Sequence, residues 1–409
     1  MTGRERILAV LDRKPVDRQP YDLGGTDCSG VHVVAYQRLR DFLGLPKKPV
    51  ECACLGQLIA KIDADVMEAL QVDAEALYFA SRETKIWNAP FKVDMVVPTL
   101  FRTEKRSDGS VVALDRAGKA YAQQAAGSFY FDPVGIPLSK VSSAAELERY
   151  DDVFERWDYP SVYDEPLEQL AQRARKQYRA TTRAVVALWR MHYLQAGQLM
   201  RGYEQFFVDL MADQALANAI LGKLHGVYMR RAKMFFDAFG DSFDVVFLTD
   251  DLGTQQSGLI SPQLYRQMLF PYVSELVAFI KSHGKKVVMH SCGAVAEFVP
   301  FLIEMGVDAL NPVQVSASGM NPRDLARQYG GQIAFWGGGC DTQSVLNAGD
   351  TSAVRSEVRL RLKEFGKEAS CVFAQVHNIQ YDVPPENIMA MYDEFRKQTG
   401  TSGKMFVEA

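Results

Sequence analysis

Residues 245–293 read VVFLTDDLGTQQSGLISPQLYRQMLFPYVSELVAFIKSHGKKVVMHSCG, and this stretch decides the fold. It begins with one apolar run, 245–249, and ends with another, 286–290, each typical of a strand buried on both faces of a parallel sheet. Between them, Ser261-Pro262 has the composition of a helix start. The apolar residues that follow recur at helical spacing, and Pro271 should kink this helix. The stretch therefore predicts a strand–helix–strand unit.

The same alternation extends over the whole chain. Eight short apolar runs occupy residues 19–23, 76–79, 184–189, 245–249, 286–290, 309–311, 333–336 and 371–374. Further helices are predicted near 203–239, 295–305, 322–329, 352–365 and 385–397. Strands that alternate with helices predict an α/β fold, a (β/α)₈ TIM barrel. An open doubly wound sheet is the alternative, because periodicity does not reveal whether the sheet closes.

One segment departs from this pattern. Between residues 84 and 130 polar and apolar residues alternate, with a turn signal at Ser107-Asp108-Gly109. We expect a single barrel domain over 1–409, with an N-terminal extension and with 84–130 as a β-rich insertion that covers one face.

The overall composition limits the classes of function. Of 409 residues, 47% are hydrophobic, enough for a large buried core. The 46 basic and 50 acidic residues leave a formal charge of −4, which argues against nucleic acid as a main partner. No apolar run is long enough to cross a membrane, and the N-terminal stretch lacks the apolar core of a signal peptide. Six cysteines in so long a chain do not form a disulfide framework, so we expect a cytoplasmic protein.

His290 and Cys292 lie two residues apart at the end of a predicted strand. In an extended chain, residues i and i+2 point to the same side, so the imidazole and the thiolate could bind one metal ion. A metal with mixed nitrogen and sulfur ligands is most simply zinc. The alternative is a buried, hydrogen-bonded histidine beside an inert cysteine.

Loops after other predicted strands carry more reactive side chains, and in a barrel these loops share one mouth. His377 after the eighth run and Cys340 after the seventh are candidates for a third zinc ligand. Asp250 and Asp251 follow the fourth run. One of them could bind metal, hold a ligand histidine in its tautomer or transfer a proton, while the other caps a helix. Cys28, after the first run, could line the mouth and is given little weight.

Several of these segments resemble, in the same order, those of the uroporphyrinogen decarboxylase superfamily. They are Arg4-Glu5-Arg6 with Asp17-Arg18-Gln19-Pro20, residues 250–256 with Ser261-Pro262, His290-Ser291-Cys292-Gly293, and His377 with Pro384-Pro385-Glu386-Asn387-Ile388. The resemblance spans nearly the whole chain and implies the (β/α)₈ barrel. The superfamily contains decarboxylases that use no metal and zinc methyltransferases that work with corrinoid proteins.

The methyltransferase branch is the better match. Its His-x-Cys motif corresponds to His290 and Cys292. Its third zinc ligand is usually a cysteine where this chain has His377, so the resemblance implies His377 as the third ligand, with Cys340 as the alternative. The decarboxylase branch carries an arginine-rich stretch after its first strand, where this chain reads Asp22-Leu23-Gly24-Gly25-Thr26-Asp27.

The resemblance thus implies a zinc-dependent methyltransferase, or demethylase. It would move a methyl group between a small methylated substrate (a methyl ether, amine or thiol) and the cobalt of a corrinoid such as cobalamin. The chain has no Asp-x-His-x-x-Gly motif, so the corrinoid must come on a partner protein. The predicted catalytic residues are Asp250 and Asp251, and the predicted substrate-binding residues are Gln255, Gln314, Trp336 and Tyr381. The rival hypotheses are a metal-free decarboxylase or lyase and a non-catalytic corrinoid- or tetrapyrrole-binding protein, and a homodimer is left open.

Overall fold

A parallel sheet forms the centre of the computed structural model, which describes residues 1–88, 91–157, 164–366, 369–401 and 406. Its strands run in the order β15-β14-β13-β12-β11-β10-β3. Their bounds are β3 (Ala74–Leu77), β10 (Ala184–Trp189), β11 (Val245–Thr249), β12 (Lys286–His290), β13 (Ala309–Asn311), β14 (Ala334–Trp336) and β15 (Cys371–Val372). Each strand coincides or overlaps with one of the predicted apolar runs, as expected when both faces of a strand are buried.

Residues 20–22 fill the eighth position of the barrel without forming a regular strand. Phe373, just beyond β15, donates its N–H to the carbonyl of Pro20, and Asp22 donates its N–H to the carbonyl of Phe373, both over 2.9 Å. On the other side Asp73, just before β3, donates its N–H to the carbonyl of Tyr21 over 2.8 Å. These bonds join the two edge strands of the sheet, and the predicted (β/α)₈ barrel is confirmed.

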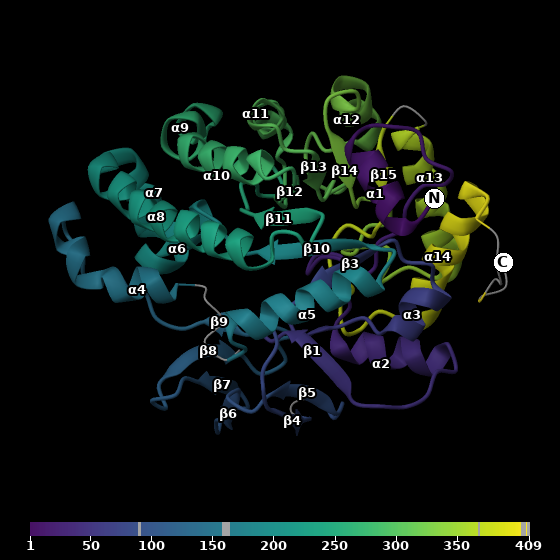
Figure 1. Cartoon of the computed structure of the whole chain (residues 1–409), viewed down its shortest axis with the longest axis horizontal. Coiled ribbons are helices and arrows are strands. Elements are labelled where there is room, and N and C mark those ends of the chain that lie inside the picture. The colour runs from purple at the N-terminus through teal and green to yellow at the C-terminus, as the bar shows by residue number, and fades with distance from the viewer. Residues whose placement is uncertain (89–90, 158–163, 367–368, 402–405, 407–409) are drawn as a thin grey trace.

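Helices surround the sheet, and Figure 1 shows α9 to α12 on one side of it, with two small sheets on the other. The longer helices are α2 (Val33–Phe42), α5 (Leu167–Ala180), α7 (Tyr203–Ala212), α8 (Gln214–Phe239), α10 (Phe270–Ser282), α13 (Thr351–Phe365) and α14 (Pro385–Thr399). The shorter helices are α3 (Ala64–Ala69), α4 (Asp151–Arg156), α6 (Leu194–Arg201), α9 (Pro262–Met268), α11 (Val299–Met305) and α12 (Pro322–Tyr329), with 3₁₀ turns η1 (Ala144–Tyr150) and η2 (Ala296–Phe298). Within the described residues, no helix combines the length and hydropathy that a membrane span requires.

Two predicted helices are each divided in two. The helix predicted over 203–239 consists of α7 and α8, and Asp213 between them accepts the N–H of Leu216 with its side chain. The helix predicted to kink at Pro271 ends at Met268 and restarts at Phe270. Proline has no N–H and its ring crowds the carbonyl one turn earlier, so Pro271 occupies the first turn of a new helix.

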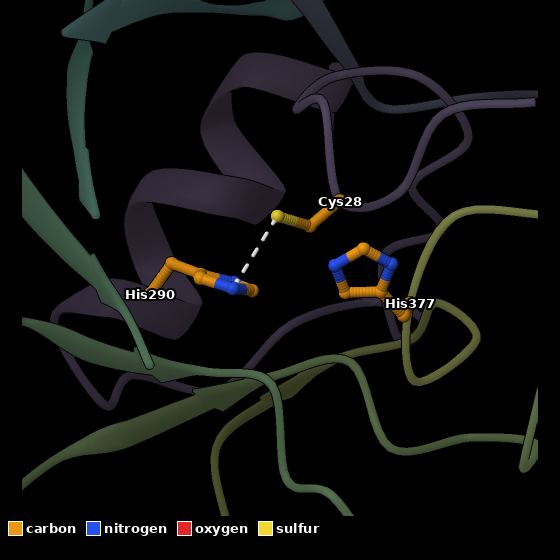
Figure 2. Close-up of side chains that lie close together, drawn as sticks. All are labelled: Cys28, His290 and His377. Carbon is orange, nitrogen blue, oxygen red and sulfur yellow. Dashed lines mark hydrogen bonds between the residues drawn. The ribbon is translucent and has the colours of Figure 1, made fainter. Parts of the chain in front are cut away.

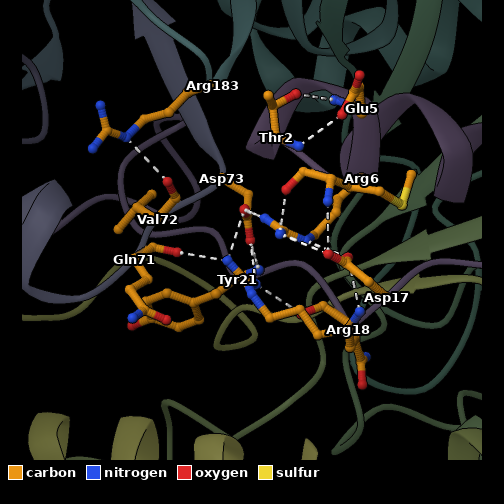
Figure 3. Close-up of polar contacts among 12 residues, drawn as sticks. Thr2, Glu5, Arg6, Asp17, Arg18, Tyr21, Gln71, Val72, Asp73 and Arg183 are labelled. Carbon is orange, nitrogen blue, oxygen red and sulfur yellow. Dashed lines mark hydrogen bonds and ion pairs between the residues drawn. The ribbon is translucent and has the colours of Figure 1, made fainter. Parts of the chain in front are cut away.

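The N-terminal helix α1 (Gly3–Leu11) is joined to the barrel by a buried ion cluster. The Asp73 carboxylate, 2% exposed, accepts hydrogen bonds from Arg6 at 2.9 Å and from Arg18 at 2.6 Å. It also accepts the backbone N–H of Tyr21 over 2.9 Å (Figure 3). Because Asp73 immediately precedes β3, this cluster fixes both α1 and the segment that closes the barrel.

Two small sheets contain the segment that was predicted to be β-rich. One has the order β2-β1-β5-β4, with β1 (Val50–Cys54), β2 (Ile59–Ala60), β4 (Thr84–Trp87) and β5 (Met95–Pro98). The other comprises β6 (Arg102–Lys105), β7 (Val111–Leu114), β8 (Ala120–Gln124) and β9 (Asp132–Pro133). The β structure therefore extends beyond 84–130, although residues 89–90 lie outside the described part of the chain. The assignment of 1–409 to a single domain stays a prediction.

Candidate metal centre

His290 ends β12 inside the barrel, and its orientation is fixed by Asn311 at the end of β13. The Asn311 side-chain nitrogen donates to the carbonyl of Trp336 over 2.9 Å, so its oxygen faces His290. That oxygen lies 2.7 Å from Nδ1 of His290, which must therefore carry the proton. Nε2 of His290 is left to face the neighbouring thiols and Asp251.

Three potential ligand atoms surround this Nε2 atom. Sγ of Cys292 lies 3.4 Å away and Sγ of Cys28 lies 3.7 Å away. Oδ1 of Asp251 is 3.5 Å from Nε2 and also accepts the backbone N–H of Cys292 over 3.0 Å. Asp251 thus contacts one candidate ligand directly and holds the backbone of another.

His377, in the loop after β15, faces the same point. Its ring centroid lies 5.7 Å from that of His290. The ligand atoms of Cys28, His290 and His377 all lie within 4.8 Å of one another, and so do those of Asp251, His290 and Cys292. Figure 2 shows the side chains of the first group converging from three separate parts of the chain.

The spacing of these atoms fits a zinc ion. With Zn–N near 2.0 Å and Zn–S near 2.3 Å, ligand atoms at the corners of a tetrahedron lie roughly 3.3–3.8 Å apart. The distances from Nε2 of His290 to the sulfur atoms of Cys292 and Cys28, 3.4 and 3.7 Å, fall in this range. Two imidazoles and two thiols also form the mixed nitrogen and sulfur donor set that zinc prefers.

The thiols of Cys292 and Cys28 both have lowered pKa values. Burial alone would raise the pKa of Cys292, but the neighbouring His290 and His377 outweigh it and lower that pKa to about 6. The pKa of Cys28 is lowered by the same two histidines against the same opposing effect of burial. Because the thiolate is the form that binds metal, both sulfur atoms are suited to coordination.

Cys340, the alternative third ligand, lies in neither group. Its side chain is fully buried, its sulfur lies 3.9 Å from the carbonyl of Asp341, and burial raises the pKa of its thiol. Cys28, which had little weight as a candidate, lies in the first group with His290 and His377. Its signal was its position directly after the first barrel run, which brings it to the mouth that His290 and His377 share.

The two neighbouring aspartates have separate surroundings. The buried Asp250 carboxylate accepts the backbone N–H groups of Tyr193, Leu194 and Gln195 and so caps the start of α6. This is the capping role expected for one member of the pair, although it serves the helix after β10, not the one after β11. Asp251 is the member that faces His290.

The four predicted substrate-binding residues are spread over different surroundings. Gln314 accepts the N–H of Gly293 over 2.7 Å, next to Cys292. Trp336 is buried and its indole N–H donates to Asp22 over 2.7 Å. Gln255 contacts Gln343 at 3.4 Å on the surface, and the Tyr381 ring packs on Phe129 with centroids 4.1 Å apart.

Comparison with known proteins agrees with the barrel. The family model described as Uroporphyrinogen decarboxylase (URO-D) matches residues 138–398. Uroporphyrinogen decarboxylases from two strains of Legionella pneumophila are 23% identical over 202 residues, which is 49% of this chain and 53% of theirs. The chain therefore matches about half the length of these curated relatives.

A solved structure extends the comparison to the whole chain. A methyltransferase from Methanosarcina mazei superimposes with a TM-score of 0.61 and 17% identity, over 97% of this chain and 99% of the other. At that identity the likeness concerns the fold. The family match covers most of the barrel, from the segment before α4 to the last turn of α14, and the chain belongs to the uroporphyrinogen decarboxylase (URO-D) family.

Proposed function

We propose that this protein is a zinc-dependent methyltransferase whose metal is held by His290, Cys292, His377 and Cys28. Two observations carry the proposal. The ligand atoms of Cys28, His290 and His377 lie within 4.8 Å of one another, and the sulfur of Cys292 lies 3.4 Å from Nε2 of His290. Enzymes on this fold bind substrates at the mouth of the barrel.

Bound there, zinc would supply a Lewis acid that polarises a methyl–heteroatom bond, and a corrinoid on a partner protein would supply the nucleophile. Hydrogen bonds within the chain orient two of these ligands. Asn311 keeps the proton of His290 on Nδ1, and Asp251 holds the backbone of Cys292. His290 is 4% exposed and Cys28 is 8% exposed, so the surrounding barrel excludes most water and strengthens the local electrostatics.

A metal-free decarboxylase is the second candidate, favoured by the Legionella relatives. An acidic substrate of that kind requires cations around the mouth. In the loop after the first barrel segment this chain places Asp22 and Asp27, and Arg190, which follows β10, is paired with Asp27 at 2.7 Å. This loop is therefore poorly suited to bind the carboxylates of such a substrate.

The test is methyl transfer to a corrinoid. Purified protein mixed with cob(I)alamin and a panel of methyl ethers, methylamines and methyl thioethers should give the absorption change of methylcobalamin with at least one of them. The reverse assay offers methylcobalamin to thiols. Turnover of any of these substrates with corrinoid rigorously excluded would contradict the proposal and favour the decarboxylase or lyase.

The free state of all six cysteines agrees with the cytoplasmic location that we propose.

A further inference from the structure

A cavity of about 860 Å³ lies at the C-terminal ends of β3 and β10, next to the two small sheets. Leu77 and Leu188 line it from these strands, Tyr121 and Phe131 from the small-sheet region, and Phe235 from α8. Its volume is that of a pocket for a molecule of several rings. The four proposed zinc ligands do not line it, so it is a separate feature of the described structure.

Loop 24–28 contacts both residues that line the cavity and the metal centre. From the cavity side, the Tyr78 hydroxyl contacts the carbonyl of Gly24 at 3.5 Å, and Arg190 pairs with Asp27 at 2.7 Å. The next residue, Cys28, faces His290 on the other side of the loop. Leu188 also packs against the barrel-interior cluster that contains Cys28. Loop 24–28 thus lies between residues that line the cavity and the proposed metal position.

Aromatic rings make up much of the lining, beside charged side chains that include Arg116, Arg156 and Arg231. Besides Tyr121, Phe131 and Phe235, the aromatic residues include Phe101, Trp157 and Trp189. Such rings bind a flat apolar ligand most favourably, because binding buries apolar surface and allows offset or edge-on contacts between rings. A molecule as small as methanol or methylamine would leave most of the cavity unfilled.

We propose that this cavity binds the non-reacting body of the methylated substrate, an apolar, largely aromatic molecule of two or more fused or linked rings. The methyl–heteroatom end of that molecule would reach the metal centre past loop 24–28. The position of the methyl group at the metal rests on the proposed function. Binding of a multi-ring ligand in the cavity can be measured without any activity.

The probe is N-phenyl-1-naphthylamine, a neutral compound of three aromatic rings that fluoresces when buried. Trp157 and Trp189 line the cavity, so binding should also quench tryptophan emission by energy transfer. We expect saturable binding of about one probe per chain with micromolar affinity. Absence of saturable binding would overturn the inference.

Gly56→Phe is the blocking variant, because Gly56 lines the cavity and a Cβ built there meets no atom within 4 Å. Gly331→Phe is the matched control, since its surroundings are equally open and it lies before β14, at the opposite end of the barrel. Gly56→Phe should weaken probe binding by about tenfold or more, whereas Gly331→Phe should leave it within about twofold. Equal affinities of the two variants would overturn the inference.

A second variant and a competition experiment test the inference further. If Gly56→Phe fails to fold by circular dichroism, Leu199→Trp fills the cavity from α6 and should weaken binding in the same direction. Cobalamin should not displace the probe, and displacement at equal concentration would assign the cavity to the corrinoid and overturn the inference. A chain that binds the probe but no zinc would contradict the proposed function alone, and one that binds zinc but not the probe would contradict this inference alone.

Discussion

Nδ1 of His290 and the side-chain oxygen of Asn311 lie 2.7 Å apart, and the Asn311 nitrogen is in turn bonded to the carbonyl of Trp336. This chain of bonds joins β12, β13 and β14 at the mouth of the barrel. It determines which nitrogen of His290 can bind a metal, since a protonated Nδ1 leaves only Nε2. Asn311 is therefore a positioning residue for the proposed zinc centre.

Removal of this positioning contact should weaken metal binding without abolishing it. Asn311→Ala is expected to lower zinc affinity roughly 10–100-fold, the usual effect of losing such an outer contact. Asn311→Asp, which keeps an oxygen toward Nδ1, should retain more of the affinity. Competition titrations with a zinc-binding dye would measure both. Unchanged affinity in Asn311→Ala would show that the contact does not position His290.

The protein should contain one zinc per chain when it is purified without added metal. Cys292→Ala should lose most of it, because the variant removes a sulfur 3.4 Å from Nε2 of His290. Elemental analysis by mass spectrometry provides the measurement. A metal-free wild type that still transfers methyl groups would contradict the proposed mechanism.

Cys28 and His377 should both matter for zinc, and Cys340 should not. Cys28→Ala and His377→Ala are each expected to weaken zinc binding by about tenfold or more, whereas Cys340→Ala should change it by less than about twofold. Cys340 is the matched control because it is a buried thiol outside the two groups of candidate ligands. If Cys340→Ala had the largest effect, the third ligand would have to be assigned to the loop after β14.

The ion cluster at Asp73 should be a main determinant of stability. Asp73→Ala leaves Arg18, 15% exposed, without a carboxylate and Arg6, 13% exposed, with only Asp17, and it should lower the free energy of unfolding by about 3–5 kcal/mol. Asp17→Ala removes a carboxylate that also pairs with Arg6 but is 43% exposed, and it should cost less than about 1 kcal/mol. Urea unfolding would measure both. Equal effects of the two substitutions would rule out the proposed role of Asp73.

Stability should fall with pH below 6.5 because of His32. Burial lowers the pKa of His32 to about 4, and its Nδ1 accepts the N–H of Val34 at the start of α2. The unfolded chain takes up this proton near pH 6.5 and the folded chain only near pH 4, so stability present above pH 6.5 is lost as the pH falls. By pH 4.5 the loss should reach about 2–3 kcal/mol.

His32→Asn supplies the control, since asparagine can accept the same N–H but does not titrate. The pH dependence between pH 7 and 4.5 should therefore be smaller in this variant by that amount. Parallel urea titrations at several pH values would show it. Identical slopes for the wild type and the variant would mean that His32 does not contribute.

The sequence by itself determined the elements of the barrel. Seven of the eight apolar runs are barrel strands because a strand buried on both faces must be apolar throughout, and that requirement is visible in any single run. The closeness of the His290 and Cys292 side chains was also predictable, because residues two apart in an extended chain point to the same side whatever the rest of the chain does. Asp213 and Pro271, where predicted helices divide, show the limit of periodicity, because a break changes only one or two residues.

Tertiary structure alone decided which distant residues meet. The closure of the barrel through Tyr21, the arrival of Cys28 beside His290, and the divergence of Asp250 from Asp251 all depend on contacts between segments far apart in sequence. Cys28 and Cys340 are both cysteines that follow barrel segments, and nothing local distinguishes them. Only the path of each loop places one thiol 3.7 Å from His290 and buries the other against Asp341.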